Sequence, residues 1–186
     1  MRIQRQFGIL IQCIFLVSLL LGCSQNNVAA ETTEFLKYED KNNNFSINYP
    51  SDWTVDIKQK DVSVLFESPK ESVQDVFTEN ITVKAFTLPD EATSPMEKYK
   101  DGIIDTIKKQ TPGIEVINTS NLTINDLPAL QILISGKRDS VDISYQMTVV
   151  FKGKIGYVLG FTCLNGDLDK YSTISNEIIN SFKVIK

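Results

Sequence analysis

Apolar and polar residues alternate along much of this chain, a pattern typical of β-strands with one buried face. In the first half, Trp53, Val55 and Ile57 share one phase of the alternation and are expected together on a buried face. Turn-forming residues such as Pro50-Ser51-Asp52 separate the alternating segments. Four strands are predicted here, at residues 45–49, 53–57, 62–66 and 81–88.

The second half of the chain contains longer alternating segments. Residues 129–134 are apolar enough for a central strand, and Lys152-Gly153-Lys154 joins two segments that alternate over their whole length. We expect this hairpin to form the middle of the sheet. The four strands predicted in this half cover residues 114–123, 127–137, 143–151 and 155–163.

Two segments change to the helical period. Ser94-Pro95-Met96-Glu97 combines a capping serine, a first-turn proline and a glutamate three residues after the cap, so a helix is predicted to begin there and to end before Pro112-Gly113. A second helix is predicted after Asn165-Gly166-Asp167, with an apolar stripe that ends at Phe182. Residues 69–79 form a charged loop in which 73–77 are expected to make a short helical turn.

Strands joined by short turns, with two helices inserted late, indicate an α+β domain. We expect one domain over residues 35–186, built on an antiparallel β-sheet of six to eight strands flanked by helices. Only two helices are available as crossovers, which disfavours a parallel nucleotide-binding fold.

The N-terminal segment directs the chain to a membrane. Arg2 and Arg5 precede an apolar run over residues 7–21 that ends in Gly22-Cys23. This ending resembles the lipobox of prokaryotic lipoproteins, and the resemblance implies a signal peptide at 1–22, cleavage after Gly22, and diacylglycerol and palmitate on Cys23. Two alternatives are an uncleaved membrane anchor and an ordinary signal peptide cut at Val28-Ala29-Ala30.

A polar spacer follows the lipidated cysteine. Residues 23–34 contain no aromatic residue and are expected to be a flexible linker. Two or three acyl chains hold a protein on a bilayer essentially permanently. The predicted location is therefore extracytoplasmic, on the cell membrane or the outer membrane, through the lipid anchor.

Charge and composition restrict the function. Of the 19 basic residues Arg2 and Arg5 leave with the signal, so 17 basic residues face 23 acidic ones and the mature net charge is −6. This charge argues against nucleic-acid partners. The chain has no histidine, which excludes Ser-His-Asp and Cys-His nucleophile systems. Cys163 lies on the inward phase of its strand and is expected to be a buried, inert thiol.

Acidic residues offer weak candidates for a metal site. Asp139 with Asp142, or Asp167 with Asp169, could give oxygen ligands to a hard cation such as calcium. Asp167 and Asp169 sit at a predicted helix start, where capping and the helix dipole explain carboxylates equally well. We therefore predict no metal site, and no cofactor beyond the covalent diacylglycerol on Cys23.

Three stretches carry a family resemblance. Residues 45–53, which read F-x-I-x-Y-P-x-x-W, the segment 155–162 and the triplet Ser181-Phe182-Lys183 resemble the PsbP-like family, which includes prokaryotic PsbP-related proteins. Lipoproteins of the DcrB type open similarly. The resemblance implies an α/β/α sandwich and a non-enzymatic accessory protein. PsbP helps photosystem II retain calcium and chloride, but the histidine used in the plant proteins has no counterpart here, so only the fold is carried over.

Three functions remain in view. The first is a lipid-anchored accessory or scaffolding protein that binds a protein partner in the envelope, at a sheet edge or through the loop 69–79. The second is an extracytoplasmic carrier of a cation or small ligand, which rests on the acidic residues. The third, a hydrolase, requires carboxylate or lysine chemistry that no motif marks, so we predict that the protein is not an enzyme.

Overall fold

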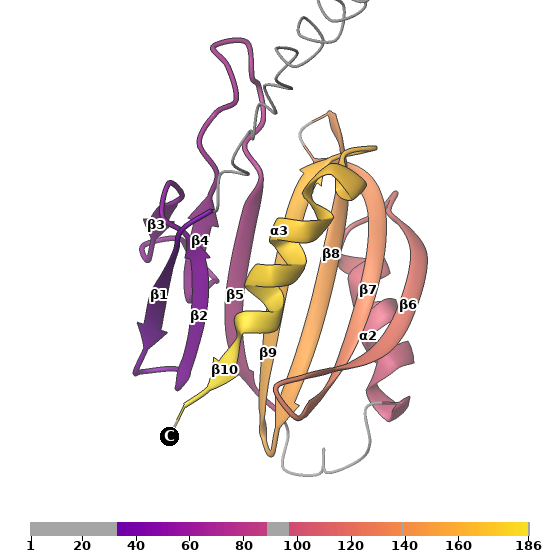
Figure 1. The fold of residues 1–186 in the computed structure, drawn as a ribbon. Coiled ribbons are helices and arrows are strands. Elements are labelled where there is room, and N and C mark those ends of the chain that lie inside the picture. The colour runs from indigo at the N-terminus through magenta and orange to yellow at the C-terminus, as the bar shows by residue number, and fades with distance from the viewer. Residues whose placement is uncertain (1–32, 89–96, 139, 186) are drawn as a thin grey trace, which may run out of the picture. The chain divides into compact units, whose positions relative to one another are not determined.

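The computed structural model describes residues 33–88, 97–138 and 140–185 (Figure 1). Residues 33–186 form one compact unit. The predicted signal peptide, Cys23 and the cap at Ser94 lie outside the described residues. No helix within the described ranges has the length and apolar character needed to cross a bilayer.

Seven antiparallel strands form the main sheet, in the order β3-β4-β5-β9-β8-β7-β6. The predicted 143–163 hairpin corresponds to β8 and β9, and its position in the middle of the sheet is confirmed. The strands of this sheet are β3 (Thr54–Asp56), β4 (Val64–Glu67), β5 (Asn80–Thr87), β6 (Glu115–Ile124), β7 (Leu127–Arg138), β8 (Val141–Lys152) and β9 (Ile155–Leu164).

A second, three-stranded sheet has the order β1-β2-β10. Its strands are β1 (Phe35–Asp40), β2 (Phe45–Pro50) and β10 (Lys183–Val184). β2 pairs over its whole length with β1 and through Ser46 and Phe45 with β10, so one strand holds both the first and the last strand of the domain. The sequence pattern predicted β2 but neither of its partners.

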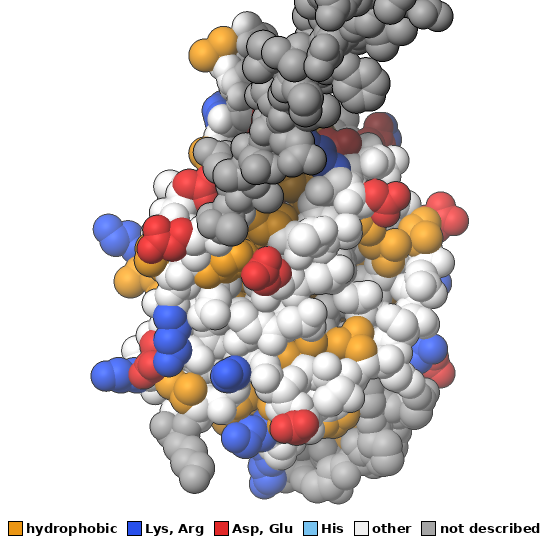
Figure 2. Space-filling view, viewed as in Figure 1, with side chains coloured by type: hydrophobic (Ala, Val, Ile, Leu, Met, Phe, Trp, Pro, Cys, Tyr) orange, Lys and Arg blue, Asp and Glu red, His pale blue; other side chains and the backbone are white. Residues whose placement is uncertain are grey.

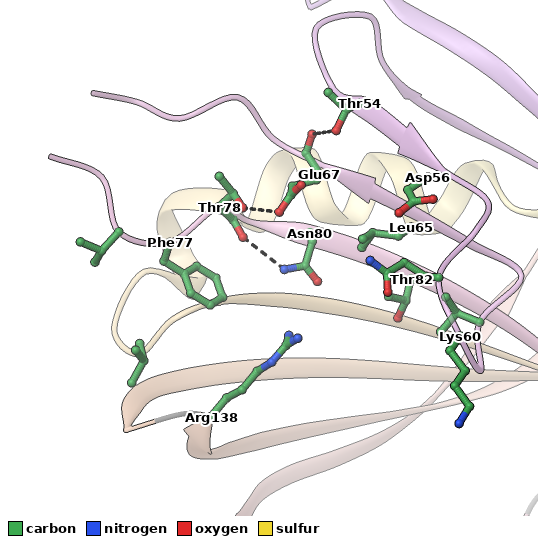
Figure 3. Close-up of a pocket in the computed structure, with 14 residues that line it drawn as sticks. Thr54, Asp56, Lys60, Leu65, Glu67, Phe77, Thr78, Asn80, Thr82 and Arg138 are labelled. Atoms are coloured by element: carbon green, nitrogen blue, oxygen red, sulfur yellow. Dashed lines mark hydrogen bonds between the residues drawn. The ribbon is translucent and has the colours of Figure 1, made fainter. Parts of the chain in front are cut away.

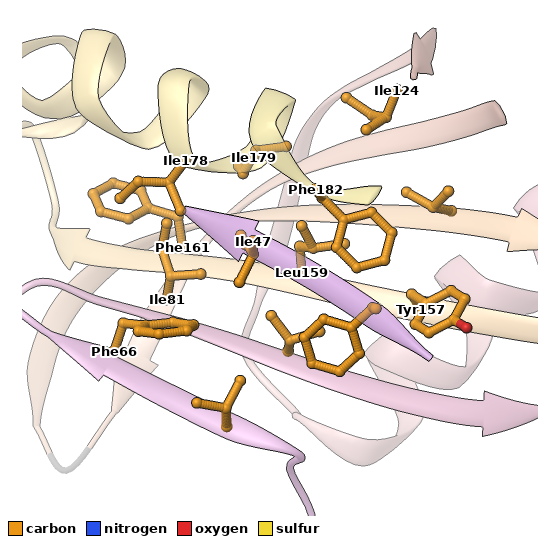
Figure 4. Close-up of a cluster of buried hydrophobic side chains, with 14 of the residues drawn as sticks. Ile47, Phe66, Ile81, Ile124, Tyr157, Leu159, Phe161, Ile178, Ile179 and Phe182 are labelled. Carbon is orange, nitrogen blue, oxygen red and sulfur yellow. The ribbon is translucent and has the colours of Figure 1, made fainter. Parts of the chain in front are cut away.

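The helices cover opposite faces of the main sheet, which gives the expected α/β/α arrangement. α3 (Leu168–Ser181) lies over one face together with β2 (Figure 1). Their side chains meet Phe66, Ile81, Leu159 and Phe161 in the larger core (Figure 4). Phe182 directly follows α3, and the centroid of its ring lies 5.7 Å from that of Phe45 and 5.1 Å from that of Tyr157.

The opposite face carries α2 (Glu97–Gln110) and a smaller core. Leu130, Ile132 and Met147 belong to this core, and Ile103, Ile104 and Ile107 of α2 are only partly buried against it. Two glycines of β9 admit aromatic rings on this face, since a Cβ at Gly156 or Gly160 would collide with Phe86 or Tyr145. Both cores lie within residues 35–184, so the unit 33–186 contains what it needs to fold on its own.

The predicted buried face of residues 53–57 is wrong. Trp53 is buried, but Val55 is 38% exposed and Ile57 is 64% exposed. The strand here, β3, has only three residues and pairs on one side alone, as an edge strand of the sheet. Trp53 instead closes a turn through its N–H, which donates to the Pro50 carbonyl at 3.0 Å.

The two predicted helices are confirmed, but the second lacks the expected side-chain cap. Asp167 occupies the N-cap position of α3 without a side-chain hydrogen bond to the helix. Asp169 lies in the first turn, where the helix dipole favours a carboxylate.

The larger core predicts a measurable stability loss. Replacing Phe182 by Ala removes a fully buried ring that contacts two others and should lower the free energy of unfolding by about 3–5 kcal/mol. Urea unfolding of the 33–186 unit measures it. Ile57→Ala is the control and should stay within about 0.5 kcal/mol, because that side chain is exposed. A loss below about 1 kcal/mol in Phe182→Ala would contradict this account of the core.

Candidate functional site

A polar groove lies on the α2 face of the main sheet, over β3, β4 and β5. Val64, Phe66, Ile81 and Val83 point into the larger core, so the alternate residues of β4 and β5 point to the opposite face. Within the described residues, the smaller core under α2 involves β7, β8 and the side chains of Phe86 and Val158, and it leaves β3, β4 and the beginning of β5 uncovered. The groove has a volume of about 590 Å³ and is lined by Thr54, Asp56, Gln59, Lys60, Val62, Leu65, Glu67, Val76, Phe77, Thr78, Asn80, Thr82, Arg138 and Val141 (Figure 3).

Hydrogen bonds order one wall of the groove. The Thr78 hydroxyl donates to Glu67 Oε1 at 2.6 Å, and the Asn80 amide donates to the Thr78 carbonyl at 3.1 Å. On the other side Arg138 extends from the end of β7 toward these residues (Figure 3). The groove therefore offers hydroxyl, amide, carboxylate and guanidinium groups to a ligand.

The loop 69–79 borders the groove through Val76 and Phe77. Its conformation is set by the Asp75 carboxylate, which accepts hydrogen bonds from the N–H groups of Glu71 and Phe77, both at 3.0 Å. These two bonds hold the pKa of Asp75 below its ordinary value. The helical turn predicted at 73–77 does not form, because side-chain bonds to the backbone compete with helical ones.

A contact with α3 fixes the base of this loop. Glu71 Oε1 accepts from the Lys170 ammonium and from the Tyr171 hydroxyl, both at 2.6 Å. The two hydrogen bonds lower the pKa of Glu71, and the bond to Glu71 raises the pKa of Lys170. Two apolar side chains on the same loop stay in solvent, with Val73 92% exposed and Val76 83% exposed.

The weak metal candidates do not converge within the described residues. Asp142 pairs with Lys137 at 3.1 Å, Asp167 and Asp169 start α3, and Asp139 is not described. The Asn165 N–H donates to the Asp142 carbonyl, so these turns share one end of the sheet. Across residues 33–88, 97–138 and 140–185 no group of three or more His, Cys, Asp or Glu residues could hold a metal ion.

Cys163 is fully buried in the larger core. Burial, followed by the charges of Glu79 and Asp167, raises the pKa of its thiol to about 12. The thiolate is the reactive form of cysteine, so this residue has the properties of an inert core thiol.

Outside the loop 69–79, sequence reasoning singled out none of the groove residues as a site. Glu67 and Asn80 lie just beyond the strands predicted at 62–66 and 81–88, and Thr82 lies on the polar phase of the second of these strands. Arg138 comes from a distant turn, so no local spacing connects it to them. The only available signal was the polar alternate phase itself. The loop 69–79, in contrast, was a candidate interface from its charge.

The family of the chain follows from a sequence comparison. A model of the PsbP-like protein family matches residues 23–184, so the chain belongs to this family. Comparison with curated proteins gives no match.

Solved structures share the fold. Cyanobacterial PsbP from Synechocystis is 16% identical, with a TM-score of 0.62 over 84% of this chain and 95% of that one. LpqN of Mycobacterium tuberculosis, described as involved in cell envelope biogenesis, is 12% identical, with a TM-score of 0.57 over 85% and 88%. The yeast Ran-binding protein Mog1p is 11% identical, with a TM-score of 0.56 over 83% and 97%. At these identities the likeness concerns the fold alone.

The buried thiol gives a direct test. In the 33–186 unit at about pH 8, Cys163 should react with a dithiobis-nitrobenzoate reagent at least about tenfold more slowly than in guanidinium chloride. Because the folded-state pKa of about 12 lies above the ordinary 9.0, the free energy of unfolding should also fall as the pH rises through this window. Fast, stoichiometric labelling of the folded protein would contradict the buried position.

Proposed function

We propose that the protein is a lipid-anchored, non-enzymatic accessory protein on the extracytoplasmic side of a membrane, where it binds a protein partner through the loop 69–79 and the adjoining groove. The observation that carries the proposal is the pair of exposed valines, Val73 and Val76, on a loop fixed by hydrogen bonds. A preordered loop loses little conformational entropy when a partner binds.

The chemistry of the surface suits a protein interface. Apolar side chains at the centre with polar groups around them are the usual arrangement at such interfaces. The valines supply apolar contact, and the groove beside them supplies hydrogen-bonding groups from Thr78, Asn80 and Arg138. The face that carries α3 shows charged side chains of both signs scattered among polar ones (Figure 2). The mixture of signs on this face supports the proposal of a protein partner over a nucleic acid, which favours a continuous basic surface.

The position of the loop suits a partner in a membrane. The Phe35 end of β1, where the domain begins, and the loop 69–79 lie at the same end of the domain (Figure 1). The predicted spacer of residues 23–34 has a root-mean-square span of roughly 20 Å if it is a flexible coil. A lipid on Cys23 would then keep the loop within reach of a membrane-embedded complex. The family match also begins at residue 23, the proposed first residue of the mature chain.

The lipid anchor has a clear chemical signature. Mass spectrometry of the membrane-extracted protein should find Cys23 as the first residue, with diacylglycerol on its sulfur. In Cys23→Ser the lipid acceptor is missing, so the heavier chain with its leader should accumulate. Cys163→Ser, which leaves the leader intact, is the control and should be processed normally. An unmodified N-terminus after Ala30 would refute the anchor.

Site-specific cross-linking tests the loop. A photo-reactive benzoylphenylalanine in place of Val73 should give one discrete adduct in native membranes, because this side chain is 92% exposed at the proposed interface. The same residue in place of Ile117, which is 53% exposed on β6, is the matched control and should give none. Adding Val76→Ser to the Val73 probe should weaken the adduct. Equal adducts from both positions, or none from either, would count against the proposed interface.

A further inference from the structure

Two apolar cavities lie between α2 and the main sheet. The first, about 380 Å³, is lined mainly by apolar side chains that include Phe86, Met147 and Val149. The second, about 280 Å³, adjoins Ile134 and Tyr145. Ile107 of α2 lines both cavities, so they are neighbours along the helix. Even without the second cavity, the volume of the first lies within the range of small-molecule sites.

The loose seating of α2 contrasts with that of α3. Ile178 and Ile179 of α3 are 0% and 2% exposed, whereas no residue of α2 between 99 and 110 is buried. Both cavities are open to solvent, so their apolar lining stays in contact with water in the described part of the chain. Covering this lining with an apolar ligand is therefore favourable.

A glycine in the middle of α2 is a second, independent observation. Gly102 lines the first cavity, and a Cβ added there would meet nothing within 4 Å. Glycine inside a helix is about 1 kcal/mol less favourable than alanine. The packing of the chain does not require the glycine, and the missing side chain leaves the cavity wider.

Two basic residues line the second cavity. Lys137 and Arg138 both line it, and Lys137 is paired with Asp142. Arg138 has no ion pair with any residue of the described ranges, and it also lines the polar groove. Arg138 thus borders both the apolar second cavity and the polar groove.

We propose that the cavities under α2 bind the acyl chain of a single-chain anionic amphiphile, with its carboxylate or phosphate head at Arg138. The apolar lining accounts for the chain, and the guanidinium accounts for the negative head, to which arginine donates paired hydrogen bonds. This site is separate from the loop 69–79 and shares only Arg138 with the groove assigned above to the protein partner. The dodecanoate test uses no partner, so its outcome does not depend on the function proposed above.

Calorimetric titration of the 33–186 unit with dodecanoate, below its micellar concentration, tests the proposal. Saturable binding of one molecule per protein is expected. Each methylene removed from the probe should raise the dissociation constant about fourfold, because each buried methylene contributes about 0.8 kcal/mol. Dodecyltrimethylammonium, with the same chain and the opposite charge, should bind at least about tenfold more weakly.

Cavity-filling variants separate binding in the cavity from adsorption on the surface. Gly102→Leu should weaken the binding of dodecanoate at least about tenfold, while the midpoint of unfolding stays unchanged or rises. Gly102→Ala removes the glycine but keeps the space, so it should bind as the parent does. Thr106→Leu, on the same wall, is a second filling variant. Arg138→Gln should weaken the binding of dodecanoate and leave the binding of uncharged dodecanol unchanged.

Three results would overturn the proposal. The first is no saturable heat with dodecanoate at any chain length. The second is equal binding by the parent and by both filling variants in their folded form, as judged by circular dichroism. The third is equal affinity for the anionic and the cationic probe, which would remove the role of Arg138.

Discussion

The structure depends on burying both faces of one hairpin, β8–β9. Tyr157, Leu159, Phe161 and Cys163 of β9 fill the larger core, while Met147 and Val149 of β8 face α2. A strand pair that is apolar on both faces is stable only when both faces are covered. The three-stranded sheet with α3 and the single helix α2 are the two covers, and the rest of the domain is arranged to hold them in place.

The two covers differ in completeness, and the candidate sites lie where cover is missing. α3 and β2 close their face with fully buried side chains, among them Ile47, Ile178 and Phe182. On the other face, within the described residues, α2 packs only partly against β7, β8 and the side chains of Phe86 and Val158, and it leaves β3, β4 and the beginning of β5 open. The polar groove and the apolar cavities are both on this face. Arg138 lines the groove and also the second of the two cavities. Both candidate sites therefore lie on the face that the described residues cover less completely.

The sequence predicted those elements whose pattern is long and regular. β8, β9 and α3 each repeat one period over nine residues or more, so their type was predicted correctly. The burial of β9 and α3 also follows the pattern, but in β8 the polar phase, Ser144, Gln146 and Thr148, is buried as well. β10 has two residues, too few to show a period, and β1 carries the exposed residues Leu36 and Lys37 in succession, which breaks the alternation. Residues 53–57 show the opposite failure, since a perfect alternation lies on a short edge strand. The groove is lined by residues of β4 and β5 and by Arg138 of β7. These residues are far apart in the sequence, so only the folded chain brings them together.

The place of β2 between the first and last strands has a consequence for biogenesis. β2 lacks one neighbour until Lys183 and Val184 are available, and Phe182, which completes the larger core, comes only just before them. A chain cut short before Phe182 therefore cannot close either the small sheet or the core beneath it. The opening strands of the domain stay unprotected until the closing ones reach them, so this half of the molecule is expected to fold and unfold as one cooperative unit.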